Sequence, residues 1–317
     1  MRRPGSGRRA LVTGGAGFIG GHLVEALVDA GWSVAVLDDF STGREENLAR
    51  SRGRIDLIRG DVCDADAVAK AIAAAEVVFH HAAVPSVALS IAEPLRTHRV
   101  NLEGTVQLLD ASRRNGVRRF LFASSAAVYG DGDGRPVSEA APLSPRSPYG
   151  LHKVSGEMYC RQYAMHHGLE SVVLRYFNVF GPRQSPEGEY AAVIPRFASA
   201  CVKGEAPRIT GDGEQTRDFI YVDDVVRATL LAADAKGAEG AILNVATGRP
   251  TNLLELLETL RDLTGARTEA KHEPALEGDV RFSAAAVARA CEVLGFRSQI
   301  DLREGLRRIV AGAVSAR

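Results

Sequence analysis

Residues 10–23 read ALVTGGAGFIGGHL, in which a short apolar run meets a glycine-rich turn and then a helical stretch. Gly14 permits a tight turn, Gly17 lets a pyrophosphate approach backbone N–H groups, and Gly20 lets the helix pack closely on the strand. The positive end of the helix dipole then faces the phosphates. Because the glycines lie between a strand and a helix, they predict a dinucleotide site rather than a turn without a ligand.

Strand-like and helical runs alternate through the first half of the chain. The expected strands are 9–13, 33–37, 55–59, 77–80, 120–123 and 171–174. The expected helices between them are 17–30, 65–74, 99–115 and 149–166. Such alternation predicts an α/β fold with a doubly wound parallel sheet of the Rossmann type, covered by helices on both faces.

The pattern changes after Arg175, where GPRQSPEGEY (181–190) has the composition of a loop. Further helices are expected at 193–202, 222–233, 253–263 and 284–294, with a buried strand at 241–245. We therefore expect two units. Residues 1–175 with about 221–248 form the dinucleotide-binding domain, and about 176–220 with 249–317 form a smaller, non-contiguous C-terminal lobe that binds the substrate.

The composition is typical of a soluble globular protein, with 45% hydrophobic and 25% charged residues among 317. The 39 basic and 39 acidic side chains balance, so no overall charge attracts nucleic acid or an anionic membrane. No run approaches the length of a membrane span. The four cysteines are far apart and form no CxxC, which disfavours a zinc site or disulfides and indicates a reducing, cytoplasmic location.

Two acids end the second expected strand and predict the choice of cofactor. Asp38 and Asp39 come about 20 residues after the last glycine, where a carboxylate accepts hydrogen bonds from the adenosine ribose. They would repel a 2′-phosphate and so favour NAD over NADP, although Arg44 lies a little downstream. Asp61 follows the third strand, where it can bind the adenine amino group or only cap the next helix.

Tyr149 and Lys153, in SPYGLHK, lie four residues apart and so share one face of an expected helix. A free tyrosine has a pKa of about 10. A neighbouring ammonium stabilises the phenolate and lowers the pKa of Tyr149, which lets it act as a base near neutrality. Ser124 and Ser125 end a strand, where ligand sites of parallel sheets form, and a serine there is placed to bond the reacting hydroxyl.

Together these motifs resemble the extended short-chain dehydrogenase/reductase family, and within it the UDP-galactose-type 4-epimerases. The resemblance covers nearly the whole chain, through TGGAGFIGGHL, GDVCD, VFHHAA, NLEGTVQLLDA, SSAAVYG, SPYGLHK, LRYFNVFGPRQ, GDGEQTRDFIYVDD and NVATG. It implies that Ser125, Tyr149 and Lys153 are catalytic and that Lys153 also holds the nicotinamide ribose. It extends the NAD site to Phe18, Ile19, Val62, His81, Ala82, Ala83, Asn101, Ser124 and Tyr176.

The resemblance also implies a reaction, the NAD-dependent 4-epimerisation of a UDP-hexose through a transient 4-keto sugar. Tyr149 would take the proton of the 4-hydroxyl while hydride leaves C4 and later returns to the opposite face. The related 4,6-dehydratases and UDP-glucuronate decarboxylases carry acids where this chain has Ala126 and Ala127, which disfavours both activities. A non-catalytic NAD(H)-binding sensor would be expected to lose Tyr149 or Lys153, and both are present.

The same resemblance places the UDP-sugar against Ser86, Asn178, Ala192, Val193, Arg217, Asp279 and Ser283, in addition to Ser125 and Tyr149. Arg217 matches the arginine that binds the pyrophosphate, although it could simply pair with Asp218 or Asp223. Leu276 stands where the family usually has a second arginine. Either Arg281 takes the place of that arginine or phosphate binding is weaker.

The preferred sugar is predicted from small residues near the substrate. Ser283 stands where glucose-only epimerases often have a tyrosine, and a small side chain leaves room for a 2-N-acetyl group. YAAVIP (190–195) and Ser86 also resemble epimerases of N-acetylated UDP-hexoses, although a loop serine often belongs only to a turn. Asn178 disfavours UDP-glucuronate epimerases, which tend to have threonine there. We expect UDP-GlcNAc/UDP-GalNAc, with UDP-Glc/UDP-Gal as further substrates. The alternative is a UDP-glucuronate 4-epimerase or another NDP-sugar epimerase or reductase of the same family.

Two expectations concern metal ions and assembly. His80 and His81 have no third ligand at zinc spacing, so they predict packing or cofactor contacts and no metal site. The related enzymes dimerise through two helices of each subunit, which here are 99–115 and 149–166. A homodimer is therefore expected.

Overall fold

Seven strands with long apolar runs form the central sheet of the protein, whose computed structural model describes residues 7–186, 192–274 and 280–315. The strand order is β10-β6-β5-β4-β1-β2-β3, and every neighbouring pair is parallel. The strands are β1 (Arg9–Thr13), β2 (Ser33–Asp38), β3 (Ile55–Arg59), β4 (Val77–His80), β5 (Arg119–Ser125), β6 (Glu170–Tyr176) and β10 (Ile242–Val245). Because the order reverses between β1 and β4, a crevice opens at the carboxyl ends of the strands.

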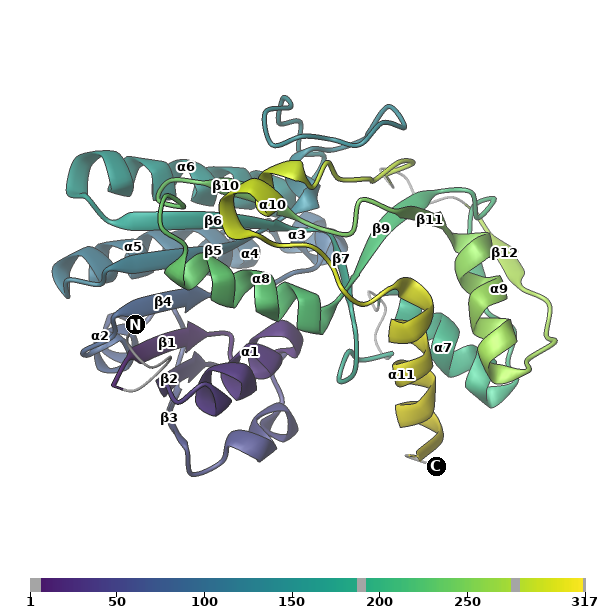
Figure 1. Cartoon of the computed structure of the whole chain (residues 1–317), viewed down its shortest axis with the longest axis horizontal. Coiled ribbons are helices and arrows are strands. Elements are labelled where there is room, and N and C mark those ends of the chain that lie inside the picture. The colour runs from purple at the N-terminus through teal and green to yellow at the C-terminus, as the bar shows by residue number, and fades with distance from the viewer. Residues whose placement is uncertain (1–6, 187–191, 275–279, 316–317) are drawn as a thin grey trace.

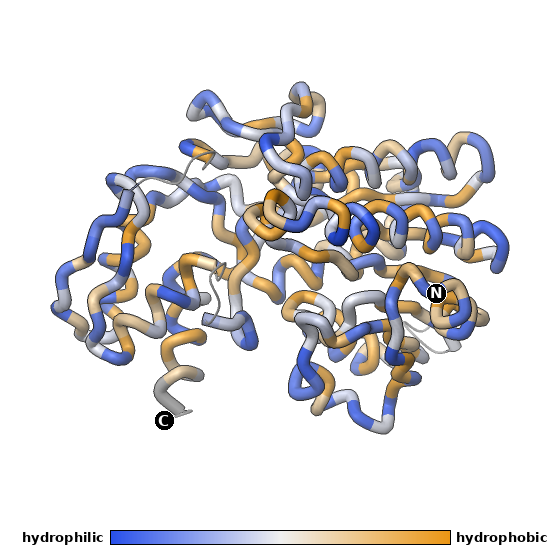
Figure 2. Tube along the Cα trace, turned by 180° about the vertical axis from the view of Figure 1, so that it is seen from behind, coloured by the Kyte–Doolittle hydropathy of each residue, from blue (hydrophilic) through white to orange (hydrophobic). Residues whose placement is uncertain are grey.

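Helices cover both faces of the sheet, and alternate residues of each strand feed two separate cores (Figure 1). Val12 faces the core shared with α1 (Phe18–Asp29), α8 (Val222–Asp234) and α10 (Ala288–Leu294). Leu11 faces the core shared with α2 (Ala65–Ile72), α5 (Gly104–Arg114) and α6 (Pro148–His167). Figure 2 shows hydrophobic residues along the central strands and hydrophilic ones in the outer loops. The predicted doubly wound parallel sheet is confirmed.

A second, smaller assembly lies beyond the carboxyl ends of the strands, at the right in Figure 1. Its strands are β7 (Asn178–Phe180), β8 (Arg208–Thr210), β9 (Thr216–Tyr221), β11 (Pro250–Asn252) and β12 (Lys271–Glu273). Its helices α7 (Val193–Lys203), α9 (Leu253–Thr264) and α11 (Leu302–Ser315) share a core that includes Phe197, Leu256 and Leu306. The division into two domains stays a prediction, and α10, which falls in the range assigned to the lobe, packs against β10.

The remaining elements are short and connect the layers. They are η1 (Glu45–Ser51), α3 (Val87–Ala92), α4 (Pro94–His98), η2 (Arg99–Glu103) and η3 (Ala126–Val128). The helix expected at 284–294 begins only at Ala288, because Ala285 instead forms a bridge with Val137. In the described ranges, every helix is too short or too polar to cross a bilayer.

Candidate active site

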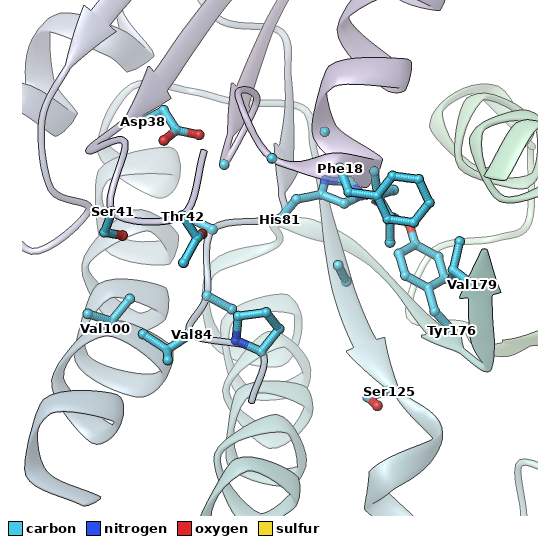
Figure 3. Close-up of a pocket in the computed structure, with 18 of the residues that line it drawn as sticks. Phe18, Asp38, Ser41, Thr42, His81, Val84, Val100, Ser125, Tyr176 and Val179 are labelled. Atoms are coloured by element: carbon cyan, nitrogen blue, oxygen red, sulfur yellow. Dashed lines mark hydrogen bonds between the residues drawn. The ribbon is translucent and has the colours of Figure 1, made fainter. Parts of the chain in front are cut away.

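A cavity of about 690 Å³ opens at the carboxyl ends of β1, β2, β4, β5 and β6. Figure 3 shows Asp38 toward one end of this cavity, and Ser125 and Tyr176 toward the other. Most of the residues predicted to bind the cofactor line it, namely Gly14, Gly17, Phe18, Ile19, Gly20, Asp38, Asp39, Asp61, Val62, His81, Ala82, Ala83, Ser124, Tyr149, Lys153 and Tyr176. Asn101 does not line it, because its side-chain amide holds the backbone of Val84 instead.

The glycine turn after β1 is compact enough that larger residues would not fit. Gly14 has a φ of +69°, and a Cβ added there would lie 2.6 Å from the backbone nitrogen of Ala82. A Cβ on Gly20 would lie 2.1 Å from the carbonyl oxygen of Gly14. Gly17 caps α1 without a side-chain hydrogen bond, so first-turn amides remain available beside the cavity. These residues fit the pyrophosphate of a dinucleotide.

Asp38 and Asp39 differ in their surroundings. Asp38 is buried, and its two carboxylate oxygens accept backbone N–H bonds from Ala16 and Phe40, each at 2.8 Å. Burial raises the pKa of this carboxyl, and the two amide bonds oppose that rise. Each oxygen keeps a lone pair for a ribose hydroxyl. Asp39 is exposed and accepts bonds from the backbone N–H and the hydroxyl of Ser41.

The sequence reasoning missed several residues beside these acids. Ser41 and Thr42 follow Asp39 and line the same end of the cavity (Figure 3). Asn47 also lines it, and its amide donates to the carbonyl of Ala16 at 2.7 Å. The polar loop FSTG after the acid pair could have indicated this extension.

The two histidines after β4 have separate roles. Both ring nitrogens of His80 are within hydrogen-bonding distance of buried threonines, Thr13 at 2.8 Å and Thr105 at 2.9 Å. His80 is therefore part of the packed interior beside the sheet. His81 lines the cavity and stacks on Tyr176, with Nε2 3.1 Å from the phenol oxygen. That oxygen also lies 2.8 Å from the hydroxyl of Thr229, which fixes the Tyr176 ring in the wall.

The catalytic candidates lie at the end of the cavity nearest β5 and β6. The helix α6 begins at Pro148, capped by Ser147, and its first turns place Tyr149 and Lys153 against the end of β5. Burial raises the pKa of Tyr149, and a hydrogen bond with Ser125 opposes that rise. The ammonium of Lys153 donates to the carbonyl of Ala123 at 2.6 Å, and burial lowers its pKa to about 8.

This arrangement differs from the sequence expectation in one respect. We expected the ammonium to lower the pKa of Tyr149. In the structure Lys153 Nζ lies 5.8 Å from the centre of the Tyr149 ring and turns toward β5. Burial is the larger effect on the pKa of Tyr149 and the hydrogen bond with Ser125 is the effect that opposes it, so the pKa is raised and not lowered.

A second cavity of about 300 Å³ adjoins the first, and Asn178, Val179, Gln184 and Ala192 line both. The substrate candidates Asn178, Ala192, Val193 and Arg217 meet here. Arg196, on α7, and Gln215 also line it and were missed by the sequence reasoning. The side-chain oxygen of Gln215 is buried without a hydrogen-bond partner in the described part of the chain. Arg196, Arg208 and Arg217 line the cavity, and no carboxylate is among its described lining residues, so the cavity favours an anion.

Other predicted substrate residues lie outside the two cavities. The hydroxyl of Ser86 caps α3 by accepting from the N–H of Leu89. The backbone N–H of Ser283 bonds to the carbonyl of Thr216, and its side chain lines neither cavity. Asp279 and Leu276 lie outside the described residues. Arg281 pairs with Asp212 at 2.7 Å and lines neither cavity, and both alternatives for the arginine replaced at 276 stay predictions.

Comparison with known proteins identifies relatives along almost the whole chain. Residues 10–246 match the model of the NAD dependent epimerase/dehydratase family. The UDP-glucose 4-epimerase of Mycolicibacterium smegmatis is 42% identical over 95% of this chain and 97% of its own length.

Two solved structures have nearly the same fold. A UDP-glucose 4-epimerase from Thermotoga maritima, solved with UDP-glucose, has a TM-score of 0.93 at 40% identity, covering 97% of this chain and 99% of that one. A UDP-N-acetylglucosamine 4-epimerase from Methanobrevibacter ruminantium, in complex with UDP-N-acetylmuramic acid, has a TM-score of 0.94 at 38% identity. The match covers 98% of this chain and 100% of the chain of that enzyme.

Proposed function

The chain belongs to the NAD dependent epimerase/dehydratase family, and we propose that it interconverts UDP-GlcNAc and UDP-GalNAc at C4 of the sugar. It is an NAD-dependent UDP-sugar 4-epimerase, and the choice of sugar is the part we propose. The observation that carries the reaction is the meeting of Ser125, Tyr149 and Lys153 at one end of a single cavity, and the choice of sugar is argued separately below. The glycine turn for the cofactor lies in the same cavity, and a cationic cavity for a nucleotide adjoins it.

Three side chains would perform the proton chemistry. Tyr149 takes the proton of the sugar 4-hydroxyl and returns it after the 4-keto sugar has turned over. Ser125 bonds to Tyr149 and is placed to hold the same sugar oxygen. Lys153 supplies a positive charge that favours the phenolate. Bound NAD⁺ supplies the hydride acceptor and a further positive charge. A 4-keto sugar must not escape, which requires that the substrate be held along its whole length.

The nucleotide would be held in the second cavity, away from the reacting carbon. Arg217 and Arg196 bring positive charge to a diphosphate, and Asn178 lines both cavities. The first turn of α7, with Ala192 as an N-cap that makes no side-chain hydrogen bond, adds the positive end of a helix dipole. The unpartnered oxygen of Gln215 can accept a hydrogen bond from the nucleoside.

Two observations favour N-acetylated sugars. By the resemblance, Ser283 stands where glucose-only epimerases often have a tyrosine, and its backbone bonds to β9, the strand that carries Arg217, although its side chain lines neither cavity. A relative with nearly the same fold is named a UDP-N-acetylglucosamine 4-epimerase. Ala126 and Ala127 offer no acid for dehydration or decarboxylation at the end of β5, which favours simple epimerisation.

We also propose that the enzyme is a homodimer. On α6, Leu151 and Met158 are 54% and 61% exposed, and Leu95 on the adjacent α4 is 85% exposed. Large apolar side chains gathered on one face are typical of a surface that another protein covers. Sedimentation of the purified protein as a monomer at micromolar concentration would contradict this proposal.

The proposal is tested by incubating purified enzyme with UDP-GlcNAc and, in parallel, UDP-Glc and UDP-glucuronate, without added NAD. Chromatography then resolves the C4 epimers. UDP-GalNAc formed faster than UDP-Gal supports the proposed preference and shows that NAD is retained through purification. Epimerisation of UDP-Glc alone, or of UDP-glucuronate alone, would contradict the sugar assignment and keep the reaction type.

A further inference from the structure

A buried group of polar side chains lies directly behind the catalytic end of the cavity. The carboxylate of Glu157 accepts two bonds from the guanidinium of Arg175, at 2.9 and 2.6 Å, and one from the hydroxyl of Ser124 at 2.5 Å. Arg175 is 1% exposed, and Glu157 and Ser124 are each 3% exposed. The reaction described so far uses neither member of this ion pair.

The network extends from Arg175 to the edge strand of the sheet. Arg175 donates to the phenol oxygen of Tyr129 at 2.8 Å, and that phenol donates to the side-chain oxygen of Asn244 at 2.6 Å. Asn244 lies on β10 and pairs in register with Arg175 on β6. The helix α6, three strands and the loop after β5 are therefore joined through one buried chain of hydrogen bonds.

Glu157 lies one helical turn after Lys153, which lies one turn after Tyr149, so the three residues share one face of α6. The other titratable groups that face Lys153 are Tyr149, His152 and Cys160 on α6, and His80 and His81 at the end of β4. Burial lowers the pKa of the histidines and raises that of Cys160, so these groups are uncharged near neutrality. Among these described neighbours, Glu157 alone brings a negative charge to Lys153.

We propose that Glu157 and Arg175 are a positioning pair for the catalytic lysine. Arg175 fixes the carboxylate, and the carboxylate holds Ser124 at the end of β5 and presents its charge to Lys153. The inference rests on the role of Lys153 in the proposed function. Burial works against the charged form of Lys153, and the carboxylate opposes that effect. Lys153 must stay charged to favour the phenolate of Tyr149.

The test follows the titration of Lys153 directly and does not depend on activity. The chain has five lysines (Lys70, Lys153, Lys203, Lys236 and Lys271), so protein carrying lysine labelled with ¹³C at Cε gives a spectrum simple enough to assign. Lys153→Arg identifies the signal. We expect Lys153 to titrate near pH 8 in the wild type and about one pH unit lower in Glu157→Gln. The pH above which kcat/KM falls should shift downward by the same amount in Glu157→Gln.

Tyr129→Phe is the matched control, because it breaks the far end of the network and leaves the charge of Glu157 in place. We expect it to lower the melting temperature and leave the titration of Lys153 unchanged. If Glu157→Gln does not fold, the double variant Glu157→Leu/Arg175→Met replaces both charges with apolar side chains and shows the same downward shift.

An unchanged titration of Lys153 in folded Glu157→Gln, or an equal shift in Tyr129→Phe, would overturn the proposal. Wild-type protein that epimerises no UDP-sugar would overturn the proposed function instead. The spectrum of Lys153 still tests the positioning pair in that case.

Discussion

Replacing Tyr149 with phenylalanine removes one oxygen from the proposed base and changes little else. The ring remains on the same face of α6, and the lost contact is a single hydrogen bond with Ser125. That bond contributes about 1 kcal/mol to stability, so the melting temperature should shift by only a few degrees. General base catalysis contributes about 10²- to 10⁴-fold, which is about 3–5 kcal/mol of the activation barrier. We therefore expect kcat to fall by that factor while bound NAD is retained.

The assay measures epimerised UDP-sugar by chromatography, together with the NAD content of the purified protein. Tyr159→Phe is the control, since Tyr159 lies on the same helix but is exposed to solvent. It should have the activity and NAD content of the wild type. If kcat in Tyr149→Phe stays within tenfold of the wild type, Tyr149 is not the base and the mechanism proposed above is wrong.

Three further perturbations test other parts of the site. Gly20→Ala places a Cβ 2.1 Å from a backbone oxygen of the same turn, so the protein should purify without NAD, whereas Gly312→Ala, in open space, should keep it. Retained NAD in the first variant would refute the assignment of this turn. Arg196→Ala should raise KM for the UDP-sugar by about tenfold or more, with kcat little changed, because the variant loses a charge-assisted hydrogen bond to the substrate diphosphate. Arg303→Ala should leave KM unchanged, since that exposed side chain pairs with Asp262 and lines neither cavity, and an equal rise in KM would contradict the role of Arg196. Met158→Glu places a charge on the apolar face of α6 and should give a monomer in sedimentation experiments; an unchanged dimer would place the interface elsewhere.

The fold could be predicted because its signals are local. Apolar runs such as 77–80 are typical of strands buried on both faces, and the alternation of strands with helices then allows few topologies. The glycine turn is partly local, since Gly20 approaches the carbonyl of Gly14 in the same turn, whereas Gly14 approaches Ala82 at the end of the neighbouring strand. Most of the predicted cofactor residues therefore line one cavity.

The sequence could not predict which partners the polar side chains have. The spacing of Tyr149 and Lys153 places them on one helix face, but the partner of the ammonium depends on how α6 packs against β5, which supplies the carbonyl of Ala123. The prediction for Ser283 rests on the resemblance, and in the structure its backbone bonds to β9 while its side chain lines neither cavity. Arg196 was missed because a lone arginine on a helix gives no signal until the fold places it at a cavity.

Glu157 and Arg175 form a buried ion pair, and burying both charges is costly. Two charges removed from water lose several kcal/mol of hydration each, and well-packed apolar residues would stabilise the same site as well or better. Stability alone therefore does not explain why this position carries an ion pair. The pair connects the helix that carries Tyr149 and Lys153 to β6, and the hydrogen bond from Ser124 to Glu157 connects that helix to the end of β5, the strand that carries Ser125. A site that must hold a base, a hydroxyl and an ammonium to a fraction of an ångström gains more from such directional contacts than from the same volume of apolar packing.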